Sequence, residues 1–236
     1  MVNPGSILEP ACLYADQGTK ELDDLVKVVK QYHCRRAIVH LGDIGFVMER
    51  IDRSRISVVV DFPYGRCGSF VLAVTIEKAT EYGIKNFDIC VDLSKIISGD
   101  FKAVQTRIEV VHIASKSTQN DKREIKAIIQ LPYLWQYAPG CIDPLICMLA
   151  RNGVSVIKDW TTVHNFSRQV DVSLTARLES LEYVKRVIRT KQLPLKVKIA
   201  GGVRPDNAVE FVKNGADILG VSVQYVPDVI RSLELA

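Results

Sequence analysis

Charged side chains recur at positions of this sequence where a buried strand should be apolar. Asp88, Lys126, Lys158 and Lys198 each fall within one of four consecutive short apolar runs. Because side chains alternate between the two faces of a strand, we expect all four to share the face opposite the most apolar residues. An isolated buried charge costs several kcal/mol unless it is paired. The pattern therefore indicates a functional site or a structural ion-pair network closing one end of a sheet, and favours the site.

Paired lysines on neighbouring strands suggest nucleophilic chemistry. A lysine has a pKa of about 10.4 in water, so almost none is neutral at pH 7. Burial and a nearby positive charge both lower that pKa, and Lys158 and Lys198 would lie on adjacent strands. One of them is then able to form a Schiff base with an aldehyde or ketone, while Asp88 moves protons directly or through water.

This chemistry needs no metal, and we expect no metal or cofactor. The four histidines are scattered without ligand spacing and fit ordinary surface or core positions better. They are His33, His40, His112 and His164.

Glycines suggest a place for an anionic group. The run Gly201–Arg204 follows the seventh apolar run and precedes a helix, and Gly220 and Ser222 belong to the eighth. Exposed backbone N–H groups and a helix N-terminus attract phosphate, and the seventh and eighth loops are its usual place in eight-stranded α/β barrels. The alternative, a tight turn without a ligand, stays open, although the two signals together favour phosphate.

The elements that must position these residues alternate along the whole chain. Eight apolar runs are expected as strands: Ala11–Ala15, Ala37–His40, Ile56–Phe62, Asn86–Asp92, Ile125–Leu131, Val154–Lys158, Leu195–Ala200 and Asp217–Val221. Helical periodicity separates them, for example from a cap at Thr19 and again over 174–188. Gly83, Gly153 and Gly215 suit helix C-caps. Alternating strands and helices predict a parallel sheet, and eight repeats predict one closed (β/α)8 barrel, a TIM barrel, over residues 1–236.

The connecting segments also predict an orientation. Ser115–Lys122 follows a helix and precedes a strand, so we expect it at the bottom of the barrel. Trp160–Ser173 follows a strand and should lie at the top, where active sites are built. Trp160 itself could stack on a substrate or pack over the barrel mouth, and the sequence leaves both open.

Composition excludes several classes of protein. The chain has 236 residues, a net charge of +4 and 47% hydrophobic residues. Basic and acidic residues are interspersed, so we expect no nucleic-acid partner. No signal-peptide pattern and no apolar run of membrane-spanning length is visible, and none of the six cysteines forms a C-x-x-C pair. We therefore expect a cytoplasmic protein with reduced cysteines and no membrane partner.

Several segments, in order along the chain, resemble the deoxyribose-phosphate aldolase family. Phe62–Gly65 resembles its F-P-x-G, and Val156–Lys158 resembles the strand that carries its Schiff-base lysine. Lys196–Arg204 resembles its V-K-A-S-G-G-I-R. Weaker matches are Asn86–Asp92 with Ser98–Asp100, and Glu124–Gln130.

The resemblance implies a TIM barrel that reversibly cleaves 2-deoxyribose 5-phosphate into glyceraldehyde 3-phosphate and acetaldehyde. It implies Lys158 as the Schiff-base residue, Lys198 as the group that lowers its pKa, and Asp88 as the proton shuttle. Lys126 would line the site. The implied phosphate-site residues are Gly201, Gly202, Arg204, Gly220 and Ser222. The partner would be a small phosphorylated sugar, and we expect a homo-oligomer because such barrels commonly assemble.

Two segments depart from the family pattern. Asp159–Thr162 stands where the family has T-S-T-G, and Glu9–Tyr14 stands where it has D-H-T-L-L-K. The altered segment after Lys158 puts the substrate in doubt more than the chemistry. Two alternatives therefore stay open: another lysine-dependent phosphosugar aldolase, and a non-catalytic barrel that binds a phosphorylated metabolite.

Overall fold

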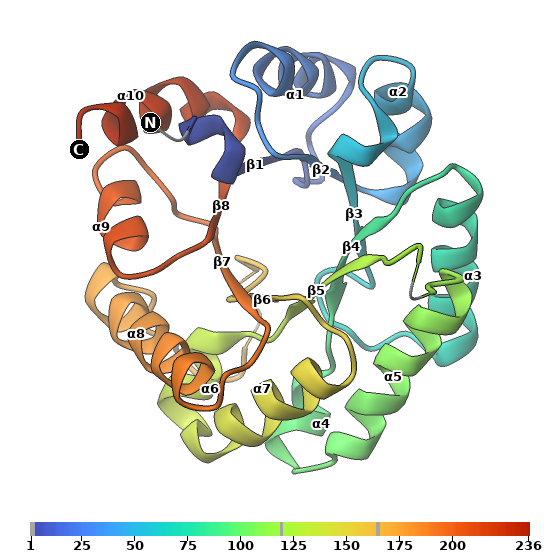
Figure 1. Ribbon diagram of the computed structural model, residues 1–236, viewed down its shortest axis with the longest axis vertical. Helices are drawn as coiled ribbons and strands as arrows, with labels where there is room; N and C mark the ends of the chain where they lie inside the picture. Colours follow the sequence, from blue (N-terminus) through green and yellow to red (C-terminus); the bar gives the residue numbers. More distant parts are fainter. Residues whose placement is uncertain (1–2, 119, 164–165) are drawn as a thin grey trace.

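The computed structural model describes residues 3–118, 120–163 and 166–236, which form a closed barrel of eight parallel strands. Each strand pairs with the next along the chain, and β8 pairs with β1 (Figure 1). The strands are β1 Leu8–Ala11, β2 Ala37–Val39, β3 Ile56–Val60, β4 Asn86–Cys90, β5 Glu124–Ile128, β6 Val156–Lys158, β7 Lys196–Ala200 and β8 Ile218–Ser222. The predicted (β/α)8 barrel is confirmed.

Helices cover the outside of the ring of strands (Figure 1). The α-helices are α1 Thr19–Gln31, α2 Ile44–Met48, α3 Ser69–Glu81, α4 Leu93–Ile97, α5 Phe101–Ala114, α6 Leu131–Tyr137, α7 Ile142–Arg151, α8 Leu174–Thr190, α9 Ala208–Lys213 and α10 Val226–Glu234. Short 3-10 turns are η1 Pro4–Ile7, η2 Leu41–Asp43, η3 Arg53–Arg55, η4 Pro139–Cys141 and η5 Val223–Tyr225. Outward side chains such as Phe87 and Ile157 are fully buried between strands and helices.

Local signals fix most helix ends. Gly83, Gly153 and Gly215 follow α3, α7 and α9 with φ angles of 81°, 77° and 99°, the left-handed conformation that glycine adopts without strain. The expected cap of α1 is displaced by one residue. Gly18, rather than Thr19, precedes the helix, because the Glu21 carboxylate accepts a hydrogen bond from the Gly18 N–H at 2.8 Å.

The first strand lies earlier than the sequence predicts. We expected Ala11–Ala15, but β1 is Leu8–Ala11, which pairs with Leu219–Ser222 of β8. The acidic side chain and the proline in Glu9–Pro10 argue locally against a buried strand. Glu9 is nevertheless fully buried, because basic side chains from other strands surround it inside the barrel.

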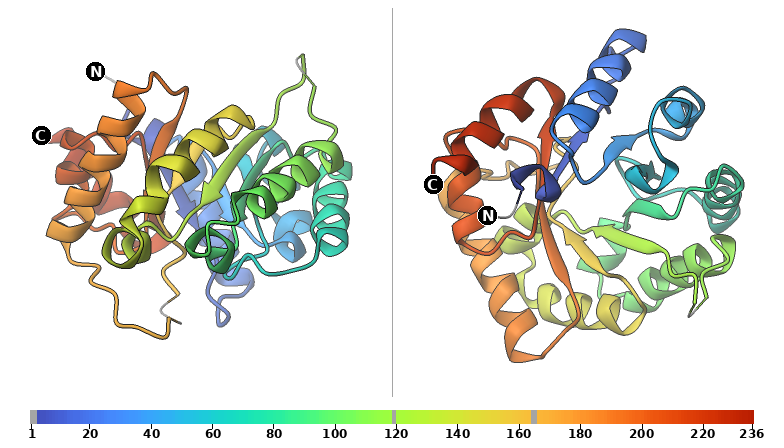
Figure 2. Two further views of the ribbon diagram at one scale, coloured as in Figure 1. Left: turned by 90° about the horizontal axis from the view of Figure 1, so that it is seen from below. Right: turned by 45° about the horizontal axis from the view of Figure 1, so that its top comes forward.

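The two ends of the barrel differ as expected. The polar segment between α5 and β5 and the long segment between β6 and α8 lie at opposite ends (left view of Figure 2). The second end carries the carboxyl ends of the strands. No helix among the described residues is long and apolar enough to cross a membrane.

Candidate functional site

Four predicted charges meet inside the barrel around one carboxylate. Asp88 of β4 is fully buried, and its Oδ1 lies 2.9 Å from the Lys126 Nζ of β5. Its Oδ2 lies 2.9 Å from the Lys198 Nζ of β7 and 3.3 Å from the Lys158 Nζ of β6. The Ser57 hydroxyl of β3 also donates to Oδ1, at 2.8 Å. Alternation along the strands therefore predicted correctly that these charges share the inner face.

The pKa values of the two lysines next to Asp88 Oδ2, Lys158 and Lys198, are shifted in opposite directions. Burial lowers the pKa of Lys158; Asp88 opposes this, and Lys198 and Lys126 add to it. Burial acts on Lys198 in the same direction, but Asp88 and Glu9 outweigh it, so the Lys198 pKa is raised. Burial disfavours the Asp88 carboxylate, yet the three ammonium groups hold its pKa well below the usual value. Lys158 is therefore the lysine of this pair that loses its proton more readily.

Glu9 is a member of this cluster that the sequence analysis missed. Its Oε2 lies 2.5 Å from the Lys198 Nζ and 3.0 Å from the Lys126 Nζ. Burial raises the pKa of Glu9. The two lysines and Arg35 lower that pKa by a larger amount, so the Glu9 carboxylate stays ionised. The available signal was an acidic residue between the apolar Leu8 and Pro10. Because Glu9 lies outside the expected strand Ala11–Ala15, strand alternation did not place it on the inner face.

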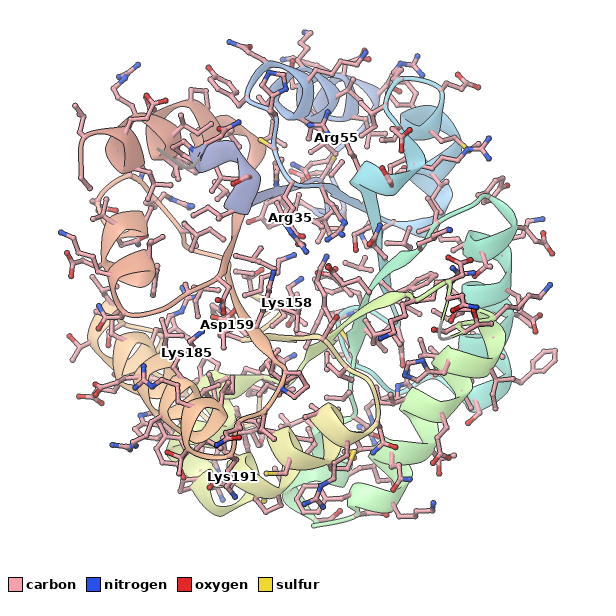
Figure 3. All side chains as sticks on the ribbon, viewed as in Figure 1. Arg35, Arg55, Lys158, Asp159, Lys185 and Lys191 are labelled. Atoms are coloured by element: carbon pink, nitrogen blue, oxygen red, sulfur yellow. The ribbon has the colours of Figure 1, made fainter. Side chains whose placement is uncertain are left out.

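A second group of charges closes the bottom of the barrel. Arg35 and Arg36, which precede β2, both contact the Glu124 carboxylate of β5 at 2.5 Å, and both also contact Glu9. Figure 3 shows Arg35 and Lys158 pointing into the ring of strands, whereas Lys191 lies at the outer rim. Glu9 joins this floor group to the lysine cluster. The floor group is thus a structural ion-pair network of the kind that the sequence left open.

Lys158 opens onto a cavity at the carboxyl ends of the strands. The cavity holds about 90 Å³. Glu9, Lys158 and Lys198 form its polar base, and its walls include Leu13, Ile38, Phe62, Trp160 and Val221. The Lys158 Nζ lies 5.7 Å from the centre of the Phe62 ring. A small carbonyl compound in this cavity would meet the Lys158 amine in mostly apolar surroundings.

Lys126 does not line this cavity. It is fully buried beside Asp88, bridging that carboxylate and Glu9. Lys126 therefore holds the Asp88 and Glu9 carboxylates in position.

The segment after Lys158 is tied to the end of β7. Asp159 Oδ1 accepts the Ala200 N–H at 2.8 Å, and its Oδ2 lies 2.5 Å from the Arg177 Nη2 of α8. Arg177 also donates to the carbonyls of Ala200 and Gly201, at 2.9 and 2.6 Å. The indole N–H of Trp160 donates to the Ala200 carbonyl at 2.8 Å, and only 3% of that side chain is exposed. Trp160 therefore packs in the wall of the cavity mouth.

The predicted phosphate residues divide into two groups. Gly201, Gly220 and Ser222 line the Lys158 cavity. Gly202 lines a neighbouring hollow that also contains Arg177, and Arg204 lies over the Tyr225 ring, its guanidinium carbon 3.9 Å from the ring centre.

Two glycines in this group are needed for space. A Cβ on Gly201 would lie 1.7 Å from Thr162 Cγ2, and one on Gly220 would lie 2.8 Å from Ala200 Cβ. The Thr162 side chain therefore covers the glycine turn on the side of the long segment.

Comparisons with known proteins point to one family, although no protein-family model matches the chain. A curated deoxyribose-phosphate aldolase from Treponema denticola is 23% identical over 205 residues, covering 84% of this chain and 87% of that protein. Another, from Streptococcus equi subsp. zooepidemicus, is 26% identical over 227 residues, covering 94% and 93%. The resemblance expected from the motifs is confirmed by these relatives.

Solved structures agree on the fold. An aldolase called QR15 superposes with a TM-score of 0.81 at 19% identity, covering 100% of this chain and 99% of that one. A deoxyribose phosphate aldolase from Aeropyrum pernix, described as tetrameric, superposes with a TM-score of 0.76 at 20% identity, covering 98% and 90%.

Proposed function

We propose that this chain, a divergent relative of the deoxyribose-phosphate aldolases, is a Schiff-base aldolase in which Lys158 is the nucleophile. The observation that carries the proposal is the state of Lys158. It is buried, its pKa is lowered, its Nζ lies 3.3 Å from Asp88, and it faces a small cavity. A neutral amine in such a place attacks aldehydes well.

Lys198 and Asp88 have complementary roles in the proposed mechanism. Lys198 keeps its proton because Glu9 and Asp88 both contact it, at 2.5 and 2.9 Å. Its fixed positive charge disfavours a second charge on Lys158. When Lys158 becomes part of an imine, Asp88 Oδ2 loses the Lys158 amine as a hydrogen-bond donor. That oxygen is then able to hold a water molecule and pass protons to and from the intermediate.

The reaction that fits these roles best is the reversible cleavage of 2-deoxy-D-ribose 5-phosphate. In the cleavage direction, with the imine at C1 of the sugar, the C3 hydroxyl loses its proton and the C2–C3 bond breaks, which releases glyceraldehyde 3-phosphate and leaves a two-carbon enamine on Lys158. The enamine carbon then takes up a proton, and hydrolysis of the resulting imine releases acetaldehyde. We propose that Gly201, Gly202, Gly220 and Ser222 surround the phosphate, with Arg204 adding positive charge nearby.

Trapping the imine tests the proposal. Purified protein is treated with acetaldehyde, then with borohydride, and its peptides are analysed by mass spectrometry. We expect a reduced two-carbon adduct on Lys158 that is absent when acetaldehyde is omitted. A panel of ketose phosphates in place of acetaldehyde separates this reaction from that of another lysine-dependent aldolase. Absence of any adduct on Lys158 with all these compounds would contradict the proposal and favour a non-catalytic binding barrel.

We also propose that the chain assembles into a homo-oligomer, as the Aeropyrum pernix protein is described to do. Sedimentation velocity of the purified chain tests this, and a monomer at micromolar concentration would contradict it.

A further inference from the structure

A second cavity lies beside that of Lys158, at the same end of the barrel. It holds about 220 Å³ and is lined by residues that follow β3, β4, β5 and β6. Thr161 and Val163 line both cavities. The two cavities therefore share a wall formed by the segment that follows Lys158.

Size limits what the first cavity holds. About 150 Å³ is enough for a benzene ring. At about 90 Å³, the Lys158 cavity suits a two-carbon donor such as acetaldehyde. The rest of a substrate must extend beyond it. The larger cavity, at about 220 Å³, has room for a substituted ring.

The walls of the larger cavity are aromatic. Tyr133 of α6 and Phe166 have ring centres 5.2 Å apart with their planes tilted by 44°, and Tyr64 lines the cavity from the segment after β3. Aromatic pairs favour such tilted contacts at separations of about 4.5–7 Å, and a further ring is able to join them. The chemistry of these walls favours a planar, ring-bearing ligand.

The rim of this cavity carries one basic and one acidic side chain, Arg66 and Asp92. Arg66 is exposed and lines it, and no acidic partner of Arg66 occurs within the described parts of the chain. The acid on the same rim, Asp92, already accepts hydrogen bonds from the backbone N–H and the hydroxyl of Ser94, at 2.9 and 2.6 Å. An anionic group on the ligand would therefore meet an arginine that is not committed elsewhere.

We propose that this second cavity binds the acceptor aldehyde of an additional aldol reaction, and that the acceptor is a ring-bearing aldehyde with an anionic substituent that pairs with Arg66. The inference rests on the proposed function of Lys158. Lys158 and acetaldehyde lose water to form an imine, which loses a proton from its methyl carbon to give an enamine. That carbon bonds to the acceptor carbonyl carbon, whose oxygen takes up a proton. Hydrolysis then releases a 3-hydroxyaldehyde and restores Lys158.

Two matched acceptors test the proposal. Product formation from acetaldehyde is followed with 4-carboxybenzaldehyde and with 4-methylbenzaldehyde, which has a similar shape but no charge. We expect turnover of both rings and a preference for the charged one. In Arg66→Gln that preference should fall by about fivefold, as for removal of one exposed ion pair. The matched control is Lys95→Gln, which removes an exposed charge on α4 outside the cavity and should keep the preference.

The outcomes separate the two proposals. If borohydride captures acetaldehyde on Lys158 but neither ring is turned over, the second cavity is not an acceptor site and the aldolase proposal stands. Equal use of both rings by the unaltered protein, or an equal loss in Arg66→Gln and Lys95→Gln, would overturn the role of Arg66. Failure to capture acetaldehyde on Lys158 would overturn both proposals.

Discussion

The floor and the mouth of the barrel are both charged, but their charges are paired to different degrees. On the floor, the Glu124 carboxylate faces Arg35 and Arg36, each at 2.5 Å. At the mouth, Lys158 contacts a single carboxylate among the described residues, Asp88 at 3.3 Å, and Asp88 is shared with two other lysines. Fully paired buried charges hold a structure together, whereas an underpaired one keeps a shifted pKa. Deeper burial and incomplete pairing together separate Lys158 chemically from the floor.

The largest expected effect comes from removing the underpaired lysine. Lys158→Met keeps the length of the side chain and removes the amine. Aldol cleavage should fall by at least about 10⁴-fold, because the covalent route is lost. Turnover of 2-deoxyribose 5-phosphate measures this, with thermal unfolding as a check that the variant is folded. Activity within tenfold of that of the unaltered protein would contradict the role of Lys158 as the nucleophile at the mouth of the barrel.

A smaller effect is expected from Lys198→Met, which removes the neighbouring cation. Lys198 lowers the pKa of Lys158, so the variant should have a higher Lys158 pKa. Activity rises with pH as Lys158 loses its proton, and this rise should move to higher pH. At neutral pH the neutral amine falls about tenfold for each unit of pKa increase. The pH profile of kcat/KM measures the shift. A lower kcat/KM with an unchanged pH profile would mean that Lys198 does not act through the pKa of Lys158.

The floor should affect stability more than activity. Glu124→Gln removes the carboxylate between Arg35 and Arg36 while keeping its shape. The free energy of unfolding should fall by about 2 kcal/mol, since two partly buried arginines lose a partner. Urea unfolding measures this, and kcat per folded molecule should stay close to that of the unaltered protein. A large loss of kcat without a loss of stability would place the floor within the active machinery.

Local pattern predicted most of the fold because strand alternation and helix period are local properties. Asp88, Lys126, Lys158 and Lys198 could be placed on the inner face from alternation alone. Glu9 could not, since its charge is tolerated only through Lys126 and Lys198, which are far away in the sequence. For the same reason, no local pattern predicted Arg177, which binds Asp159 and the glycine turn from α8.

The phosphate prediction shows a second limit. Glycines in Gly201–Arg204 indicated an anion site, but the sequence could not tell which neighbours share the space. Thr162 lies over Gly201 and Arg204 stacks on Tyr225, contacts set by the packing of separate loops. Composition of a turn predicts its backbone shape, whereas the space above the turn depends on the rest of the fold.

The seam between β1 and β2 is the place where the strand pairing of β1 is weakest. β1 meets β2 through one register pair, Ala11 with Ile38, but meets β8 along its whole length. Arg35 fastens this seam, since its backbone N–H donates to the Leu8 carbonyl at 2.9 Å and its guanidinium binds Glu9. A barrel that breathes does so first where fewest strand contacts hold it. An opening at this seam would part Glu9 from Arg35 but not from Lys198, because β1 stays paired with β8 and β8 with β7, so the floor would loosen while the lysine cluster stayed together.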